Sequence, residues 1–175
     1  MSFDPSHLIL AVSAVLGFYA FQTHGRRRML TCKLCADILY GIYLFLIGGY
    51  TGAAGAMIAA LGGFTQVLTP PHLTRKSRPY RFIAACILSV SGAYYLSDSV
   101  TDVMPLIGVI VARFVELFQS TLILRCGFLI AAATWVYYTY MNSFYLATCM
   151  SLLMMAAMVL GILKNERRLP KDPVP

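Results

Sequence analysis

Seven apolar stretches divide this chain, and every lysine and arginine except Arg113 falls in or beside every second connection between them. The connections after the first, third, fifth and seventh stretches are basic, and they contain Arg26, Arg27, Arg28 and Lys33, then Arg75, Lys76, Arg78 and Arg81, then Arg125, and finally Lys164, Arg167, Arg168 and Lys171. The alternate segments, residues 1–7, 48–52, 97–102 and 141–143, contain no Lys or Arg. Basic residues near span ends are retained in the cytoplasm during insertion, so the pattern predicts seven transmembrane helices with the N-terminus outside and the C-terminus inside.

The composition favours an all-α integral membrane protein. Hydrophobic residues make up 59% of the chain and charged residues 12%, which leaves too little polar surface for a water-soluble domain. The predicted spans are residues 5–23, 29–47, 50–69, 81–96, 103–119, 121–140 and 143–163, each adequate or slightly short for a bilayer that needs about 20 helical residues. The first stretch is preceded by Asp4 and followed by arginines, so we interpret it as a retained span and not a signal peptide.

The loop lengths predict a three-plus-one-plus-three organisation. Residues 1–69 would form a first triple-helix bundle, 70–102 a basic loop and a linker helix, 103–163 a second bundle, and 164–175 a cytoplasmic tail. A single intervening span gives both bundles the same orientation, as in parallel internal repeats. Aligning Cys32 with Cys126 also places Tyr43 on Tyr137, although the identities between the two halves are few.

Several short motifs carry a resemblance to a known family. They are Arg27-Arg28-Met29, Gly41, Phe45-Leu46, Gly48-Gly49-Tyr50, Pro105-Leu106-Ile107-Gly108, Arg125-Cys126 and Trp135-Val136. The chain resembles the bacterial inner-membrane protein family typified by YgjV, which is distantly similar to the superfamily of SWEET and SemiSWEET sugar carriers, PQ-loop transporters, PnuC vitamin transporters and the KDEL receptor. The resemblance implies the fold first, solute transport second, and a location in the bacterial inner membrane.

The chain departs from that superfamily in its prolines. SWEET carriers have mid-membrane prolines in several helices that line the pocket, whereas only Pro105 lies inside a predicted span here. Any bending of the helices would therefore depend on Gly17, Gly41 and Gly108.

Four ionisable residues fall inside or at the edge of predicted spans. Lys33 and Asp37 are four residues apart in the second span, and Arg113 and Glu116 are three apart in the fifth, so each pair shares a helix face. An unpaired charge at the centre of a membrane helix costs about 2.5 to 3.5 kcal/mol on insertion scales, which implies pairing or a wet cavity. The two pairs either meet and exchange partners as a cytoplasmic gate or an anion-binding pocket, or each merely neutralises itself so that its helix inserts.

An aromatic and polar set lies farther from the basic ends. Tyr40 and Tyr43 in the second span and Trp135, Tyr138 and Asn142 in the sixth could stack on a solute and orient it through hydroxyl and amide groups. The alternative is an aromatic belt at the headgroups, which suits the tyrosines nearer the outer ends.

Other classes of function have little sequence support. No catalytic motif is present, so we expect neither an enzyme nor a cofactor, and the basic residues form short clusters unlike a nucleic-acid-binding face. Cys32 and Cys35 form a CxxC pair that His24 and His72 could complete, but only the two sulfurs have fixed spacing and we predict no metal site. The sequence thus predicts a transporter of a small polar solute, with a non-transporting receptor or an accessory subunit as the alternative. The expected partners are the lipid bilayer and the solute, together with a second copy of the chain or a partner membrane protein if the protein forms an oligomer or a complex.

Overall fold

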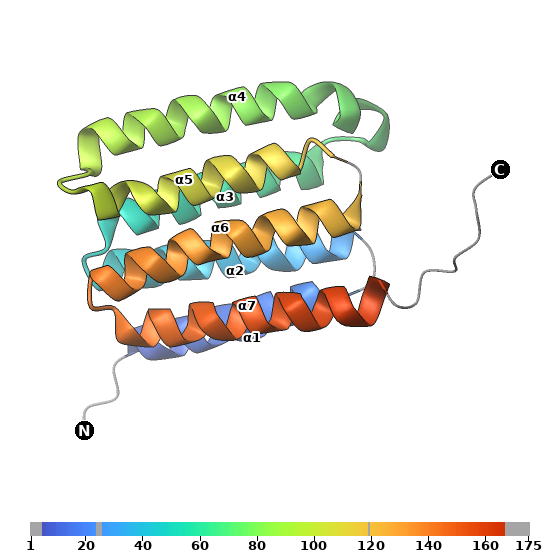
Figure 1. Cartoon of the computed structure of the whole chain (residues 1–175). Coiled ribbons are helices and arrows are strands. Elements are labelled where there is room, and N and C mark those ends of the chain that lie inside the picture. The colour runs from blue at the N-terminus through green and yellow to red at the C-terminus, as the bar shows by residue number, and fades with distance from the viewer. Residues whose placement is uncertain (1–4, 24–25, 119, 167–175) are drawn as a thin grey trace.

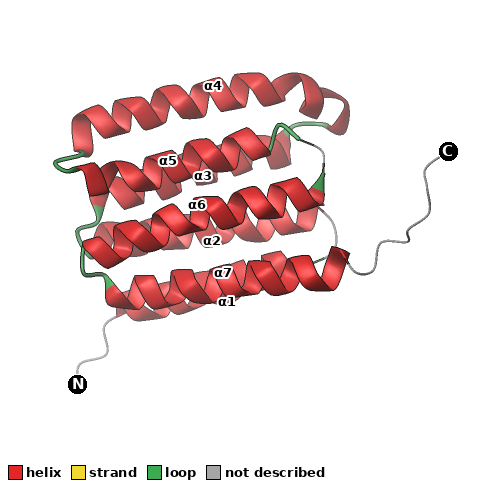
Figure 2. Ribbon diagram, in the orientation of Figure 1, coloured by secondary structure: helices red, strands yellow, loops and turns green. Residues whose placement is uncertain are grey.

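The computed structural model describes residues 5–23, 26–118 and 120–166, and these residues form helices and no strand (Figure 2). The seven helices are α1 (Pro5–Gln22), α2 (Arg26–Leu46), α3 (Tyr50–Leu68), α4 (Pro71–Leu96), α5 (Val100–Val115), α6 (Thr121–Met141) and α7 (Tyr145–Glu166). The prediction of an all-α chain is confirmed. The predicted tail lies outside the described residues, except that α7 continues to Glu166.

The helices form two layers, with α4 at one edge (Figure 1). In one layer α1 packs on α2 and α2 on α3, and in the other α5 packs on α6 and α6 on α7. Contacts between α1 and α7 and between α3 and α5 join the layers, while α4 packs on both α3 and α5. Successive helices run in opposite directions, so the ends of α1, α3, α5 and α7 and the beginnings of α2, α4 and α6 lie together. We call this the basic end of the bundle.

Helices α2, α4 and α5 begin earlier than predicted, α2 at Arg26 instead of residue 29. The connection predicted as a basic loop is helical, because α4 already begins at Pro71, and a proline is favoured at the first position of a helix. Helix α5 begins at Val100, where the Ser99 side chain and the Asp102 carboxylate form a capping box that satisfies the first backbone N–H groups. Conversely, Glu116 follows the last residue of α5 instead of lying within the helix.

The outer surface of the bundle is apolar. Large hydrophobic side chains are exposed along its helices, among them Val15, Leu61, Val90, Ile130 and Leu153. Five helices (α1, α2, α3, α6 and α7) are long and apolar enough to cross a membrane. Helix α4 carries several basic residues, and α5 has 16 residues, fewer than the about 20 that a span typically needs. The exposed apolar surface implies contact with the lipid bilayer.

The small residues of α3 pack inside the chain. Gly52, Gly55, Ala56, Ala59 and Gly63 are buried. A Cβ atom at Gly52 would lie 2.6 Å from the ring of Tyr138, and one at Gly55 would lie 3.3 Å from Trp135. The glycines thus allow the aromatic side chains of α6 to approach the backbone of α3.

Candidate functional site

A cavity of about 140 Å³ lies between the two layers. Its lining comes from α1, α2 and α3 on one side and α5, α6 and α7 on the other, and α2 and α6 face each other across it. Most of the lining is alanine, glycine, methionine and other apolar side chains. Polar groups are contributed mainly by Ser13, Lys33, Asp37, Tyr40 and Ser151. The cavity is therefore an apolar chamber with polar groups gathered largely on α2.

The Lys33–Asp37 ion pair forms the charged part of this wall. The Lys33 Nζ donates to Asp37 Oδ2 at 2.6 Å, and the two side chains remain 18% and 21% exposed, so both charges are accessible. The Lys33 Nζ also lies 5.3 Å from the centroid of the Phe128 ring on the opposite wall, within the range of a cation–π contact. The pair is formed within one helix, as the i, i+4 spacing predicts.

Tyr40 and Trp135 meet across the cavity from α2 and α6. Their ring centroids are 5.6 Å apart in an edge-to-face arrangement. The hydroxyl groups of Tyr40 and Ser151 are within hydrogen-bond distance at 3.4 Å, and the Ser13 hydroxyl donates to the carbonyl oxygen of Ala36 at 2.8 Å. Tyr40 and Trp135, two of the predicted site residues, thus both line the central cavity.

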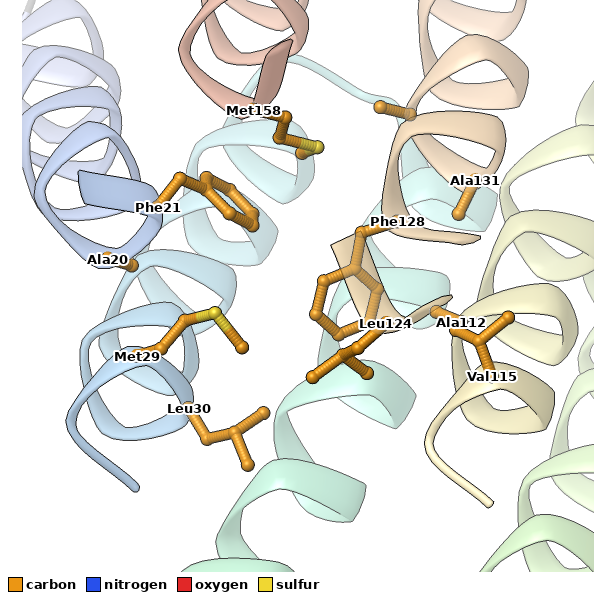
Figure 3. Close-up of a cluster of buried hydrophobic side chains, with 11 residues drawn as sticks. Ala20, Phe21, Met29, Leu30, Ala112, Val115, Leu124, Phe128, Ala131 and Met158 are labelled. Carbon is orange, nitrogen blue, oxygen red and sulfur yellow. The ribbon is translucent and has the colours of Figure 1, made fainter. Parts of the chain in front are cut away.

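Apolar clusters flank the cavity at both ends. At the basic end, the rings of Phe21 and Phe128 pack edge to face with centroids 6.3 Å apart. Both side chains belong to a buried cluster that also contains Met29 from the first turn of α2 and Leu124 from the first turn of α6 (Figure 3). At the opposite end, a second cluster is built around Leu10, Tyr43, Leu44, Ala53 and Ala147.

Arg113 and Glu116 do not line the central cavity. The Arg113 Nη1 donates to Glu116 Oε2 at 2.6 Å, and with side-chain exposures of 4% and 8% this pair is far more buried than Lys33–Asp37. The Arg113 guanidinium also donates to the carbonyl oxygen of Ala59 on α3. Together with Arg78 and Arg81 of α4, the pair lines a second, much smaller cavity. The structure therefore does not bring the two charged pairs into one site, and each is paired within its own segment.

Three other predicted site residues are absent from the lining of the central cavity. Tyr43 is buried beside Tyr40 in the cluster at the opposite end. The Tyr138 hydroxyl accepts hydrogen bonds from Thr51 Oγ1 at 3.3 Å and from the backbone N–H of Gly52 at 3.2 Å, which ties α6 to the first turn of α3. Asn142 caps α6, and its amide donates to the carbonyl oxygen of Tyr138.

Sequence reasoning overlooked Arg125 as an internal residue. Its position in a basic connection suggested a membrane-face charge, but it lies within α6, is 4% exposed, and donates through Nη1 to the carbonyl oxygen of Phe21 at 2.9 Å. The absence of a side chain at Gly161 makes room for it. Its place several residues after the start of α6 could have signalled this burial, whereas nothing in the sequence singled out Ser13 or Ser151.

The residues of the metal hypothesis are only partly placed. Cys32 and Cys35 lie on α2 as free thiols. His24 and the side chain of His72 lie outside the described residues.

The apolar surface, the bundle of long helices and the internal cavity with a partly accessible ion pair define a polytopic helical membrane protein. More particularly, the chain belongs to the bacterial inner membrane protein family Imp-YgjV, whose family model matches residues 5–168. Its location is accordingly the bacterial inner membrane. No curated protein and no solved structure matches the chain.

Proposed function

We propose that this protein carries a small polar solute across the inner membrane by alternating access between two triple-helix bundles, α1–α3 and α5–α7, joined by the linker helix α4. The basic end would face the cytoplasm, as the one-sided Lys and Arg residues predict. The central cavity, lined by both bundles and flanked at each end by an apolar cluster, is the observation that carries the proposal.

The cavity lining supports a parallel repeat, because most of its positions recur at a constant spacing of 95 residues. Helix α2 corresponds to α6, with Lys33, Ala36, Asp37 and Tyr40 matching Phe128, Ala131, Ala132 and Trp135. Helix α1 corresponds to α5, with Ser13, Ala14 and Gly17 matching Gly108, Val109 and Ala112. Helix α3 corresponds to α7, with Ala56 and Ala59 matching Ser151 and Met154. A chamber built from equivalent positions of two copies is typical of carriers with an axis along the membrane normal.

The turns between helices support the same register. The N–H of Gly49 donates to the carbonyl oxygen of Leu44, and the N–H of Phe144 donates to that of Thr139, again 95 residues on. Gly48 and Ser143, which are also 95 residues apart, both have positive φ angles, so the two turns share the same backbone conformation at this position. This register differs by one residue from the alignment of Cys32 with Cys126, and it brings Tyr43 onto Tyr138.

Hydrogen bonds between the two bundles supply candidate gates at both ends. At the basic end, Arg113 and Arg125 each donate to a backbone carbonyl of the other bundle, on α3 and α1 respectively. At the opposite end, the Tyr138 hydroxyl joins α6 to α3 through Thr51. Opening either end by rocking one bundle would break the bonds of that end while leaving the others in place. In this scheme Arg113 acts as a gate residue by bridging α5 and α3, and needs no exchange with Lys33–Asp37.

The proposed carrier mechanism is the one that a distant relation to SWEET and PQ-loop transporters, expected from the sequence resemblance, would imply. That architecture also includes a receptor, so a non-transporting role is the alternative. The two roles differ in one physical respect: a carrier exposes its cavity to each side in turn, whereas a receptor needs only one opening.

Thiol labelling of a cavity residue tests this difference. Cys32, Cys35, Cys86, Cys126 and Cys149 are first replaced by serine or alanine, and Ser13→Cys is then introduced as a nearly isosteric thiol in the cavity wall. Small, membrane-impermeant thiol reagents without net charge are applied to oriented vesicles from the outside or the inside. We expect labelling from both sides. The matched control is Ser91→Cys on the exposed face of α4, which the same reagents should not reach within the bilayer.

Labelling of Ser13→Cys from one side alone would contradict alternating access and favour a receptor. Uptake into proteoliposomes across a panel of sugars, nucleosides, vitamins and amino acids then measures transport directly. Arg113→Ala should abolish uptake while folded protein remains, because the gate at the basic end is lost; loss of folded protein alone would assign Arg113 a structural role.

A further inference from the structure

We infer that the central cavity binds a small zwitterion with an apolar body, of the size and chemistry of a branched aliphatic amino acid. In this arrangement the ligand carboxylate pairs with Lys33 and the ligand ammonium with Asp37. The inference rests on the proposed function in that it names the solute class of the same cavity.

The charge of the cavity favours a ligand whose own net charge is zero. Lys33 and Asp37 are the two charged side chains of the lining, and they neutralise each other. A singly charged solute would add an uncompensated charge to this apolar chamber, and burial of an unpaired charge is strongly unfavourable. A zwitterion adds one charge of each sign, so that four alternating charges can pair and none remains unbalanced.

The repeat makes the two walls of the cavity chemically different. Lys33 and Asp37 on α2 correspond to Phe128 and Ala132 on α6, so the ionic groups occur on one wall and apolar groups occupy the equivalent places on the other. A ligand with its charged groups toward α2 and a hydrocarbon body toward α6 matches both walls. A ligand that is polar all round would leave groups without partners against α6.

The hydroxyl groups of the lining also argue against a sugar. The Ser13 hydroxyl already donates to the carbonyl oxygen of Ala36, and the hydroxyls of Tyr40 and Ser151 lie within hydrogen-bond distance of each other. Few groups therefore remain to satisfy several sugar hydroxyls, each of which must exchange its bonds with water for bonds in the site.

The volume sets the size of the ligand. A protein cavity of about 150 Å³ accepts benzene, so one of about 140 Å³ accommodates a body of roughly that size, or about six to nine non-hydrogen atoms once the charged ends reach the ion pair. Leucine lies at the upper end of this range.

Fluorescence of Trp135 gives a direct binding assay. Trp135 is the sole tryptophan of the chain and lines the cavity, so its emission should respond when the cavity fills. The full chain in lipid nanodiscs is titrated with leucine, with 3-methylbutylamine, which lacks the carboxylate, with 4-methylpentanoate, which lacks the ammonium, and with glucose. We expect leucine to bind most tightly, and each truncated analogue about tenfold to a hundredfold more weakly, as the loss of one charge-assisted interaction predicts.

Charge-neutralising variants assign the two ends of the ligand. Lys33→Gln should weaken leucine and 4-methylpentanoate but spare 3-methylbutylamine, whereas Asp37→Asn should weaken leucine and the amine but spare the acid. The double variant K33Q/D37N leaves no unpaired charge in the cavity, so its folding should not be disturbed as that of a single variant could be. It should lose the preference for leucine over the amine and the acid. Lys76→Gln, on the exposed surface of α4, is the matched control and should bind leucine unchanged.

Equal or tighter binding of the amine, the acid or glucose would overturn the inference, as would leucine binding that is unaffected by Lys33→Gln and Asp37→Asn. An absence of any response to leucine would overturn it as well. Each of these results leaves the proposed carrier function to be decided independently by labelling of Ser13→Cys from the two sides of the membrane.

Discussion

Gly62 gives the sharpest test of the Arg113 bridge between α3 and α5. A Cβ atom at Gly62 would lie 2.7 Å from Cζ and 2.8 Å from Nε and Nη1 of Arg113, distances that side-chain contacts do not tolerate. Gly62→Ala must therefore displace the guanidinium, and with it the hydrogen bond to the carbonyl oxygen of Ala59. The neighbouring Gly63→Ala makes the same chemical change, but there the new Cβ would lie 3.6 Å from Leu34, an ordinary contact.

The comparison of the two variants isolates the effect of the displaced guanidinium. Both gain the same helix propensity, up to about 1 kcal/mol per Gly→Ala substitution. Only Gly62→Ala loses a hydrogen bond from a charged group, which contributes about 1.5 to 3 kcal/mol. We therefore expect the free energy of unfolding of Gly62→Ala to lie about 1.5 to 3 kcal/mol below that of Gly63→Ala.

Reversible unfolding in mixed micelles, with an increasing fraction of denaturing detergent, measures this difference. In an Arg113→Met background the guanidinium is gone, so the two glycine variants should differ by less than about 0.5 kcal/mol, the usual limit for uncoupled sites. Equal stabilities of Gly62→Ala and Gly63→Ala in the wild-type background would refute the reasoning, since Arg113 could then not lie against Gly62.

Two further predictions concern the other hydrogen bonds between the two helix layers. Gly161→Ala should reduce stability by about 2 to 4 kcal/mol, because its Cβ would lie 2.6 Å from the backbone carbonyl oxygen of Phe21, which cannot move aside as a side chain can. The control is Gly92→Ala, where the atoms nearest to the new Cβ lie 3.7 Å away. Thermal unfolding measures the difference, and equal melting temperatures of the two variants would contradict the prediction. Tyr138→Phe should cost about 1 to 3 kcal/mol, because it deprives a buried N–H at the start of α3 of its acceptor. Tyr94→Phe on the exposed surface should change stability by less than about 0.5 kcal/mol, and a similar loss in both variants would exclude the capping role.

The helical architecture could be predicted from the sequence because its signals are local. Apolar stretches and turn residues placed α1, α3 and α6 within one or two residues of their observed ends. The fourth helix was predicted too short, because Arg75, Lys76, Arg78 and Arg81 suggested a loop, whereas basic residues are well tolerated in a helix that emerges from the apolar layer. The pairing of Lys33 with Asp37 and of Arg113 with Glu116 also followed from local spacing.

The candidate site was harder to predict because it depends on contacts between distant segments. Tyr40 and Trp135 line the cavity, but Tyr138 and Asn142, on the same helix as Trp135, do not. Helical spacing gives the relative angle of two side chains but not which angle faces a partner helix. The proposed internal repeat illustrates the same limit, since a one-residue change of register separates the alignment of Cys32 with Cys126 from the 95-residue spacing proposed from the cavity lining.

The sequence by itself determined the class of the protein, its family and the residues available for charge pairing, because hydropathy, the one-sided arginines and i, i+4 spacing are properties of short segments. Only the tertiary structure decided which charges share a chamber. It placed Lys33 and Asp37 in the central cavity, held Arg113 and Glu116 apart from it, and turned Arg125 from a surface charge into a buried bridge. The physical reason is that burial depends on the packing of helices remote in the chain, and on glycines such as Gly62 and Gly161 that leave room for a guanidinium.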